Sequence, residues 1–200
     1  MASVVFLRAI NVGGANLCKP AALAKELSKY DIVNIGAVGT FVVRKNVIES
    51  VLRSAIAKKL PFRCEIMICP ARAILDVAQK NPFAREPSGP EFTRFVSVLH
   101  APPPKRPRLP LVLPEPEGVA SSKPARRDPP SNQTSNLKPQ TSANWLLKII
   151  AIPDRFVLGI YRRQMKAIGH LGKIEKILGV PGTVRNWNTI EKVVKILGEE

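Results

Sequence analysis

The sequence predicts an α+β protein made of two ferredoxin-like (split β-α-β) subdomains, each with an antiparallel sheet backed by helices. Two observations carry this prediction. Residues 4–68 pass through apolar stretches of strand and helix character in the order β-α-β-β-α-β, which is the split β-α-β order. A second, less regular series begins at Phe92, and it is interrupted where residues 101–140 hold eleven of the chain's 19 prolines.

The first series opens with a strand, a glycine turn and a helix. Val4–Ile10 is apolar apart from one arginine, which is typical of a strand covered on both faces. Asn11–Asn16 contains two adjacent glycines and predicts a turn. Pro20 favours the first turn of a helix, and the apolar residues after it recur at helical spacing as far as Tyr30.

Two strands, a helix and a last strand complete this series. Ile32–Ile35 and Thr40–Arg44 are short strands rich in β-branched residues, and Gly36–Gly39 between them predicts a hairpin turn. The next apolar positions have helical spacing and end near Lys58–Pro61. Phe62–Ile68 alternates as a strand.

The subdomain boundary is expected just after the next helix. Pro70–Phe83 has a helical apolar stripe, so we place the first subdomain at residues 1–84 and the second at 90–200. The proline-rich insert of the second subdomain spans 101–144 and predicts a flexible segment, with at most one short strand near Leu109–Leu113.

The rest of the second series repeats the first. Trp145–Ile152 and Phe156–Tyr161 predict a β-hairpin. One helix follows, with Ile168 and Leu178 at the ends of its apolar stripe. A last helix is expected to start at Thr183 as its N-cap, with Trp187 anchored in the core.

The formal net charge is +16, from 31 Lys and Arg against 15 Asp and Glu. The excess is spread along the whole chain, so it attracts polyanions in general and marks no single groove. The alternative is a basic surface without a ligand.

Targeting and metal signals are weak. The apolar runs are far shorter than the ~20 residues that cross a bilayer, and the N-terminus is predicted to be a strand instead of a signal peptide. We therefore expect a cytoplasmic protein with reduced thiols, no membrane contact and no cofactor. Cys64 and Cys69 are expected on opposite faces of one strand, and the only histidines are His100 and His170, so no metal site is predicted.

Two segments carry candidate ligand-binding residues. In the glycine turn, the N–H groups of Gly13 and Gly14 could hold an oxyanion, with Asn11 and Asn16 beside them. A turn that only requires positive φ is the alternative. Arg8 is the one charge in an apolar strand, and it needs either an anionic ligand or a carboxylate such as that of Glu65, which stays open at this stage.

The second segment is the expected start of the last helix. Arg185 and Asn188 lie three residues apart and are expected to share a helical face, with Asn186 between them. Helix capping is the alternative for this polar cluster. If both chain ends converge on one cleft between the subdomains, Arg185 would supply a bidentate charge to a ligand held by the glycine turn.

Two motifs at opposite ends of the chain resemble one bacterial family, the domain of unknown function 1697. LRAINVGGAN is similar to the family pattern LRGINVGG-N, with Ala9 where the pattern has Gly. TVRNWNT at 183–189 is similar to its closing T-x-RNW-x-T. The resemblance implies two ferredoxin-like subdomains and no established reaction. One departure stands out: a Q-S-G-N stretch of the family is here Ala37-Val38-Gly39-Thr40, so three of its polar groups are replaced.

Two function hypotheses follow. The first is a non-catalytic binding protein for a polyanion such as nucleic acid, acting through dispersed Lys and Arg. The second is an enzyme or binding protein for a phosphorylated small molecule at the Asn11–Asn16 turn and the Arg185–Asn188 segment. The sequence contains no readable catalytic set, and it leaves enzymatic activity and oligomeric state open.

Overall fold

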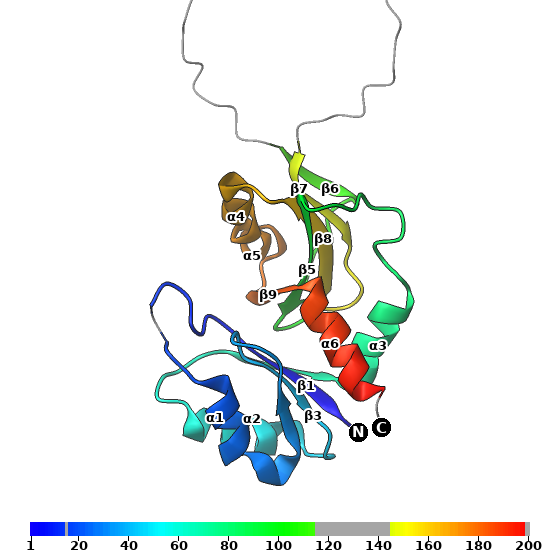
Figure 1. The fold of residues 1–200 in the computed structure, drawn as a ribbon. Helices are drawn as coiled ribbons and strands as arrows, with labels where there is room; N and C mark the ends of the chain where they lie inside the picture. The colour runs from blue at the N-terminus through cyan, green and yellow to red at the C-terminus, as the bar shows by residue number, and fades with distance from the viewer. Residues whose placement is uncertain (15, 115–144, 199–200) are drawn as a thin grey trace, which may run out of the picture.

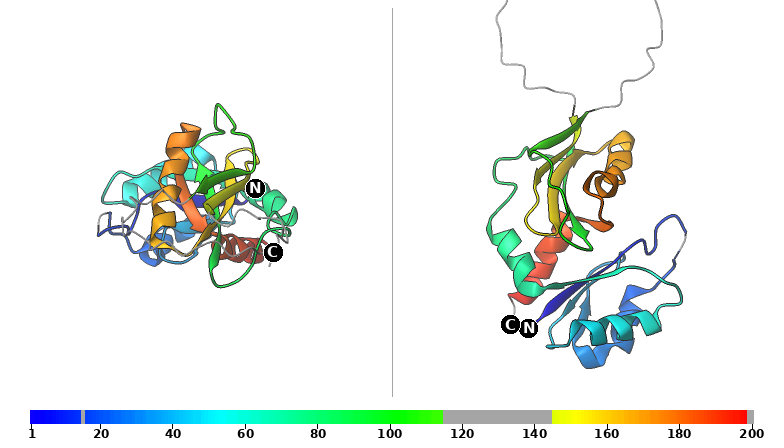
Figure 2. Two further views of the ribbon diagram at one scale, coloured as in Figure 1. Left: turned by 90° about the horizontal axis from the view of Figure 1, so that it is seen from above. Right: turned by 180° about the vertical axis from the view of Figure 1, so that it is seen from behind.

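The computed structural model describes residues 1–14, 16–114 and 145–198, which form two antiparallel sheets backed by helices (Figure 1). The predicted α+β class is confirmed. The view from behind shows the two sheets one above the other along the molecule, with helices on their flanks and between them, and in the view from above the two halves overlap (Figure 2). No helix in the described part of the chain is long and apolar enough to cross a bilayer.

The first sheet has four strands in the order β2-β3-β1-β4, and all neighbours are antiparallel. Its strands are β1 (Ser3–Leu7), β2 (Ile32–Asn34), β3 (Thr40–Val43) and β4 (Ile66–Pro70). Helices α1 (Pro20–Glu26) and α2 (Glu49–Lys59), with the 3-10 helix η1 (Ser28–Tyr30), cover one face. Their apolar side chains pack with the inward residues of β1 and β3 into a core that belongs to this sheet alone.

The second sheet has five antiparallel strands in the order β6-β7-β8-β5-β9. Its strands are β5 (Phe92–Leu99), β6 (Leu111–Pro114), β7 (Trp145–Ala151), β8 (Phe156–Arg162) and β9 (Gly182–Asn186). Helices α4 (Met165–Leu171) and α5 (Lys173–Leu178) lie on its outer face, where Ile174 and Leu178 fill a second core. If β6 is set aside, the remaining order β7-β8-β5-β9 corresponds strand by strand to the order β2-β3-β1-β4 of the first sheet.

Two helices join the sheets. Helix α3 (Ala71–Gln79) follows β4, α6 (Trp187–Leu197) follows β9, and the two lie side by side between the sheets (Figure 1). Their apolar faces pack against the inner faces of both sheets, so one continuous core spans the molecule. Trp187 is buried there, as predicted, and its ring meets that of Phe83 edge to face at 4.9 Å.

Several predicted boundaries change. The strand expected at Phe62–Ile68 is β4 at Ile66–Pro70, because it pairs with the full length of β1 and leaves the preceding loop outside the sheet. The edge strand expected near Leu109–Leu113 is β6 at Leu111–Pro114. The predicted flexibility of the insert falls mostly on residues 115–144, which lie outside the described residues.

The region after β8 differs more. The single helix expected between Ile168 and Leu178 is two helices, which meet at Gly172. Ile168, which was expected in the apolar stripe, lies in α4 and is 54% exposed. Thr183 is not an N-cap: it lies in β9, and Asn186 caps α6 by accepting a hydrogen bond from the N–H of Asn188 at 3.0 Å.

We expect Cys69 to be unreactive toward an aromatic disulfide reagent at pH 8 in the folded protein. Its side chain is fully buried in the core between the sheets, and burial raises the pKa of its thiol to about 11, so the reactive thiolate is scarce. Cys18 and Cys64 are half-buried on the other face of the first sheet, and burial raises the pKa of both thiols. Two thiols should therefore react slowly before denaturation and a third only afterwards. A Cys69→Ser variant should lose only the third, and three equal native rates would contradict the prediction.

Candidate functional site

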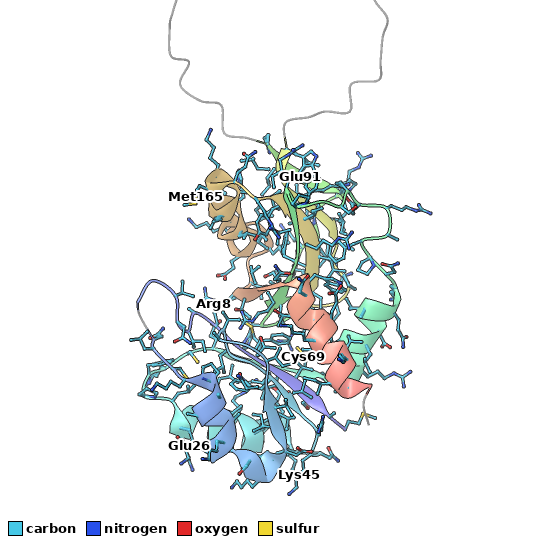
Figure 3. The ribbon with its side chains drawn as sticks, in the orientation of Figure 1. Arg8, Glu26, Lys45, Cys69, Glu91 and Met165 are labelled. Atoms are coloured by element: carbon cyan, nitrogen blue, oxygen red, sulfur yellow. The ribbon has the colours of Figure 1, made fainter. Side chains whose placement is uncertain are left out.

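A cleft of about 330 Å³ is lined by residues of both halves of the molecule. The end of β1 and the loop after it form one wall, and the start of α5 with β9 forms the other. Figure 3 shows Arg8 at this junction. Arg185 also lines the cleft, as do Val12 from the glycine turn and Val38 from the β2–β3 hairpin. The structure thus brings Arg8, Arg185 and one residue of the glycine turn to a single cavity.

Arg185 is buried, with 5% of its surface exposed. It lies in β9 opposite Val96, so its side chain points from an edge strand of the second sheet toward the first. The prediction that it shares a helical face with Asn188 is wrong, because the chain turns from strand to helix only at Asn186. Pairing with β5 outweighs the local helix signal.

All five N–H groups of the Arg185 guanidinium have an acceptor. Nε donates to Thr40 Oγ1 at 2.8 Å, and the ring of Phe6 lies 5.8 Å from Cζ. Nη1 and Nη2 donate to four further oxygens, namely Thr183 Oγ1 at 2.7 Å, Val184 O at 2.9 Å, Leu7 O at 2.7 Å and Val38 O at 2.7 Å. One side chain therefore connects β9 with β1, β3 and the hairpin between β2 and β3.

The acceptors of Arg185 are all neutral. Burial lowers the pKa of its guanidinium to about 10, and no carboxylate of the described residues offsets this effect. The group still carries its proton at neutral pH. The guanidinium has all its hydrogen bonds, but no negative charge of the described residues is paired with it. Such a positive charge at the cleft wall raises the local electrostatic potential and favours an anion nearby.

Arg8 connects the same two sheets through charge. Its Nη2 donates to Glu175 Oε2 at 2.7 Å, and its Nε donates to Glu175 Oε1 at 3.3 Å and to Gly182 O at 3.0 Å. The expectation of a buried arginine in a strand is wrong, since Arg8 follows the last residue of β1 and its side chain is 36% exposed. Of the two alternatives left open, an anionic ligand or a carboxylate such as that of Glu65, the structure shows carboxylates beside Arg8. Glu65 lies at 3.7 Å, and the main partner, at 2.7 Å, is Glu175 of α5, which the sequence did not suggest.

The glycine turn is organised by its asparagines. The side chain of Asn11 donates to Cys18 O at 2.9 Å and Ala37 O at 2.8 Å, and its Oδ1 accepts from the N–H of Cys18 at 2.8 Å. Asn16 Nδ2 donates to Ala9 O at 3.1 Å. Gly13 and Gly14 have φ of 60° and 77° and are exposed at the tip, outside the lining of the cleft. Both asparagines thus hold the loop, which presents Val12 to the cavity.

We expect Ala9→Gly to stabilise the protein by about 1 kcal/mol, because Ala9 has a φ of 54°, where a Cβ is strained. The family pattern LRGINVGG-N, which residues 7–16 resemble, has glycine at this position. Urea unfolding measures the change. Ala57→Gly in α2 is the matched control and should lose about 1 kcal/mol, since its backbone is helical. A loss in both variants would contradict strain at Ala9.

Asn186 and Asn188 are not at the cleft. They line a separate hollow at the start of α6, and this hollow also includes Arg94 and Arg163. The structure therefore divides the predicted residues between two places. Sequence reasoning missed Glu175 and Arg94, because their positions depend on contacts between segments far apart in the chain.

Thr40 shows how the departure from the family pattern is accommodated. The replaced stretch Ala37–Thr40 still supplies two acceptors to Arg185, the carbonyl of Val38 and the hydroxyl of Thr40. A threonine where the pattern has asparagine keeps an acceptor oxygen at the position that Nε contacts. A backbone carbonyl, that of Val38, therefore provides one of the polar groups of this stretch.

The chemistry available at the cleft is that of anion binding. Two guanidinium groups and one carboxylate, that of Glu175, line the cleft, and the carboxylate of Glu65 lies 3.7 Å from Arg8 outside this lining. The charge of Arg185 is the one without a paired carboxylate among the described residues. Among the described residues, no group of three His, Cys, Asp or Glu side chains could hold a metal ion.

The fold and the cleft define an α+β protein in which two antiparallel sheets share a core, with a cleft lined by two arginines between them. The family model described as "Protein of unknown function (DUF1697)" matches residues 1–121, which is more than half of the chain, so the protein belongs to this family. The match includes Arg8 and the glycine turn and ends before Arg185. No curated protein and no solved structure matched the chain.

Proposed function

We propose that the protein binds a small organic anion, such as a phosphorylated metabolite, in the cleft between its two sheets. The observation that carries this proposal is the buried guanidinium of Arg185, which reaches the cleft wall without a compensating carboxylate. A buried unpaired charge is costly, and a bound anion would offset that cost.

Arg8 supplies the direct contact in this proposal. The five N–H groups of Arg185 are occupied by protein acceptors, so Arg185 acts on the ligand through its charge. Arg8 is part-exposed, and its Nη1 has no partner in the part of the chain that the structure describes. An oxyanion could therefore bind Arg8 beside Glu175.

The rest of the cavity favours an apolar group on the ligand. Val12 and Val38 are 63% and 41% exposed at the rim, and Leu171 faces them from α4. A volume of about 330 Å³ is at the small end of the range for ligand sites. The ligand class is thus a compact anion with an apolar or sugar-like body.

A thermal-shift and calorimetric screen of nucleoside monophosphates and sugar phosphates tests the proposal. A ligand should stabilise the wild-type protein, and Arg8→Gln should weaken its binding at least tenfold because the direct contact is lost. The double variant Arg8→Gln/Glu175→Gln keeps the net charge of the wild type and should bind as weakly as the single variant. Recovery in the double variant, or unchanged affinity in both, would exclude Arg8 as a ligand contact.

Polyanion binding is the second candidate function, and a lysine-lined groove favours it. Lys29, Lys58 and Lys59 line a groove of about 660 Å³ between η1 and α2, and Lys45 adds a fourth ammonium by donating to Lys29 O at 3.3 Å. Figure 3 shows Lys45 at the end of the first sheet that is farthest from the second. Only Glu26 opposes these charges in the groove lining, where it pairs with Lys59 at 3.0 Å.

A gel-shift titration at two salt concentrations tests this second candidate. Binding of a single-stranded oligonucleotide should fall steeply with salt, since phosphate contacts release counterions. Lys29→Gln/Lys58→Gln should weaken it at least tenfold, whereas Lys173→Gln/Lys192→Gln removes two exposed lysines elsewhere and should change it less than threefold. Equal losses in the two variants would assign the effect to net charge alone.

We also propose that each sheet with its helices is a ferredoxin-like subdomain, at about residues 1–84 and 90–200. The order β2-β3-β1-β4, with α1 and α2 on one face, supports this for the first half. The matching order β7-β8-β5-β9 supports it for the second, in which the described residues between β5 and β7 form the strand β6 where the first half has α1.

A further inference from the structure

We propose that the hollow at the start of α6 is a second binding site, for a phosphate group, with Arg94 and Arg163 as its principal ligands. The hollow has a volume of about 240 Å³ and is separate from the cleft between the sheets. This proposal does not depend on the function proposed for the cleft.

The hollow exists because β9 is shorter than β5. The pairing of these strands ends at Phe95 and Asn186, where the chain turns into α6. Residues 92–94 of β5 pair with β8 on one edge and have no strand on the other within the described residues. Side chains from both faces of the sheet therefore reach the open edge.

Two arginines are fixed at this edge. Arg163 Nε donates to Thr93 Oγ1 at 3.0 Å, and Thr93 is buried, so the guanidinium is positioned while its two Nη atoms have no partner among the described residues. Arg94 is half-buried, and its Cζ lies 5.6 Å from the centre of the Phe83 ring. Two pre-positioned guanidinium groups are a typical arrangement for phosphate recognition.

The asparagines add neutral donors. Asn186 uses Oδ1 to accept the N–H of Asn188, which leaves its Nδ2 as a donor. Asn188 is exposed and also lines the hollow. No Asp or Glu lines it, so the donor set is one-sided and selects an acceptor-only group such as phosphate.

Glu91 is an acidic side chain at the rim of the hollow. A Cβ built at Gly89, which lines the hollow, would lie 2.5 Å from Glu91 Oε2, so this carboxylate is at the rim. Its charge opposes an incoming anion. Removing it therefore provides a variant in which binding should become stronger.

Titration of the full-length protein with inorganic phosphate at low ionic strength tests the proposal, with the side-chain amide signals of Asn188 as the readout. Arg163→Gln and Arg94→Gln should each weaken phosphate binding at least tenfold, and Glu91→Gln should strengthen it at least twofold. Arg72→Gln is the matched control, because Arg72 is 82% exposed on α3, and it should change binding less than twofold.

Two further probes identify the source of the phosphate. Adenosine monophosphate and an oligothymidylate are titrated into the same variants. If the monophosphate binds more tightly than inorganic phosphate and depends on Arg163, the ligand is a phosphate monoester. If the oligothymidylate does so with a steep salt dependence, the site binds a nucleic-acid backbone. Absence of an Asn188 response, or equal losses in Arg163→Gln and Arg72→Gln, would overturn the proposal. Arg8 does not line this hollow, so Arg8→Gln should leave phosphate binding at the hollow unchanged, and the two proposals are tested separately.

Discussion

Replacing Arg185 with Ala is expected to lower the free energy of unfolding by about 4 kcal/mol. The substitution leaves five oxygens without their donor, among them the buried hydroxyls of Thr40 and Thr183. It also removes the hydrogen bonds by which β9 is joined to β1, to β3 and to the hairpin between β2 and β3. Relief of the desolvation cost that lowers the pKa of Arg185 to about 10 offsets only part of this loss.

Guanidinium chloride unfolding, followed by tryptophan fluorescence and circular dichroism, measures the effect of Arg185→Ala. Arg185→Lys should lose about 2 kcal/mol, since an ammonium keeps the charge and offers three donors instead of five. Arg72→Ala, at a site that is 82% exposed, should stay within about 0.5 kcal/mol of wild type. If Arg185→Ala lost less than about 1 kcal/mol, the hydrogen bonds of Arg185 would not hold the two sheets together.

Gly159→Ala is expected to lower the free energy of unfolding by about 3 kcal/mol. Gly159 lies in β8 directly opposite Phe95. A Cβ at this position would lie 2.5 Å from Phe95 Cζ and 2.6 Å from Lys148 O. The ring is fully buried, and the carbonyl belongs to the adjacent strand β7, so neither can move without disturbing the sheet.

Gly169→Ala is the matched control for Gly159→Ala. Gly169 lies inside α4 and has no atom within 4 Å of a built Cβ, so alanine should stabilise the protein by about 0.5–1 kcal/mol through helix propensity. In the double variant Gly159→Ala/Phe95→Leu, the smaller side chain should recover part of the loss, because only the contact with Lys148 O remains. Additive losses would contradict the clash with Phe95.

The helices and strands of this protein can be predicted from the local sequence wherever apolar residues recur at the spacing of a helix or a strand. Phe92–Leu99 and the hairpin after Trp145 are strands because successive apolar side chains fill both faces of the second sheet. The hairpin turn before Thr40 and the helix at Pro20 follow from glycine and proline, whose backbone preferences act within a few residues. The sequence by itself therefore determined the α+β class and most of the element order.

The candidate sites depend on tertiary contacts that have no local signal. Arg185 is in a strand because β5 offers its edge for pairing, and a polar run before a tryptophan cannot be distinguished locally from a helix cap. Arg8 and its partner Glu175 are 167 residues apart in the chain.

The tertiary structure also decided how the predicted ligand residues are divided, with Arg8 and Arg185 at the cleft and Asn186 and Asn188 at the hollow beside α6. The physical reason is that secondary structure reflects preferences over a few residues. The position of a charged side chain depends on which distant acceptors the packed sheets bring within hydrogen-bond distance.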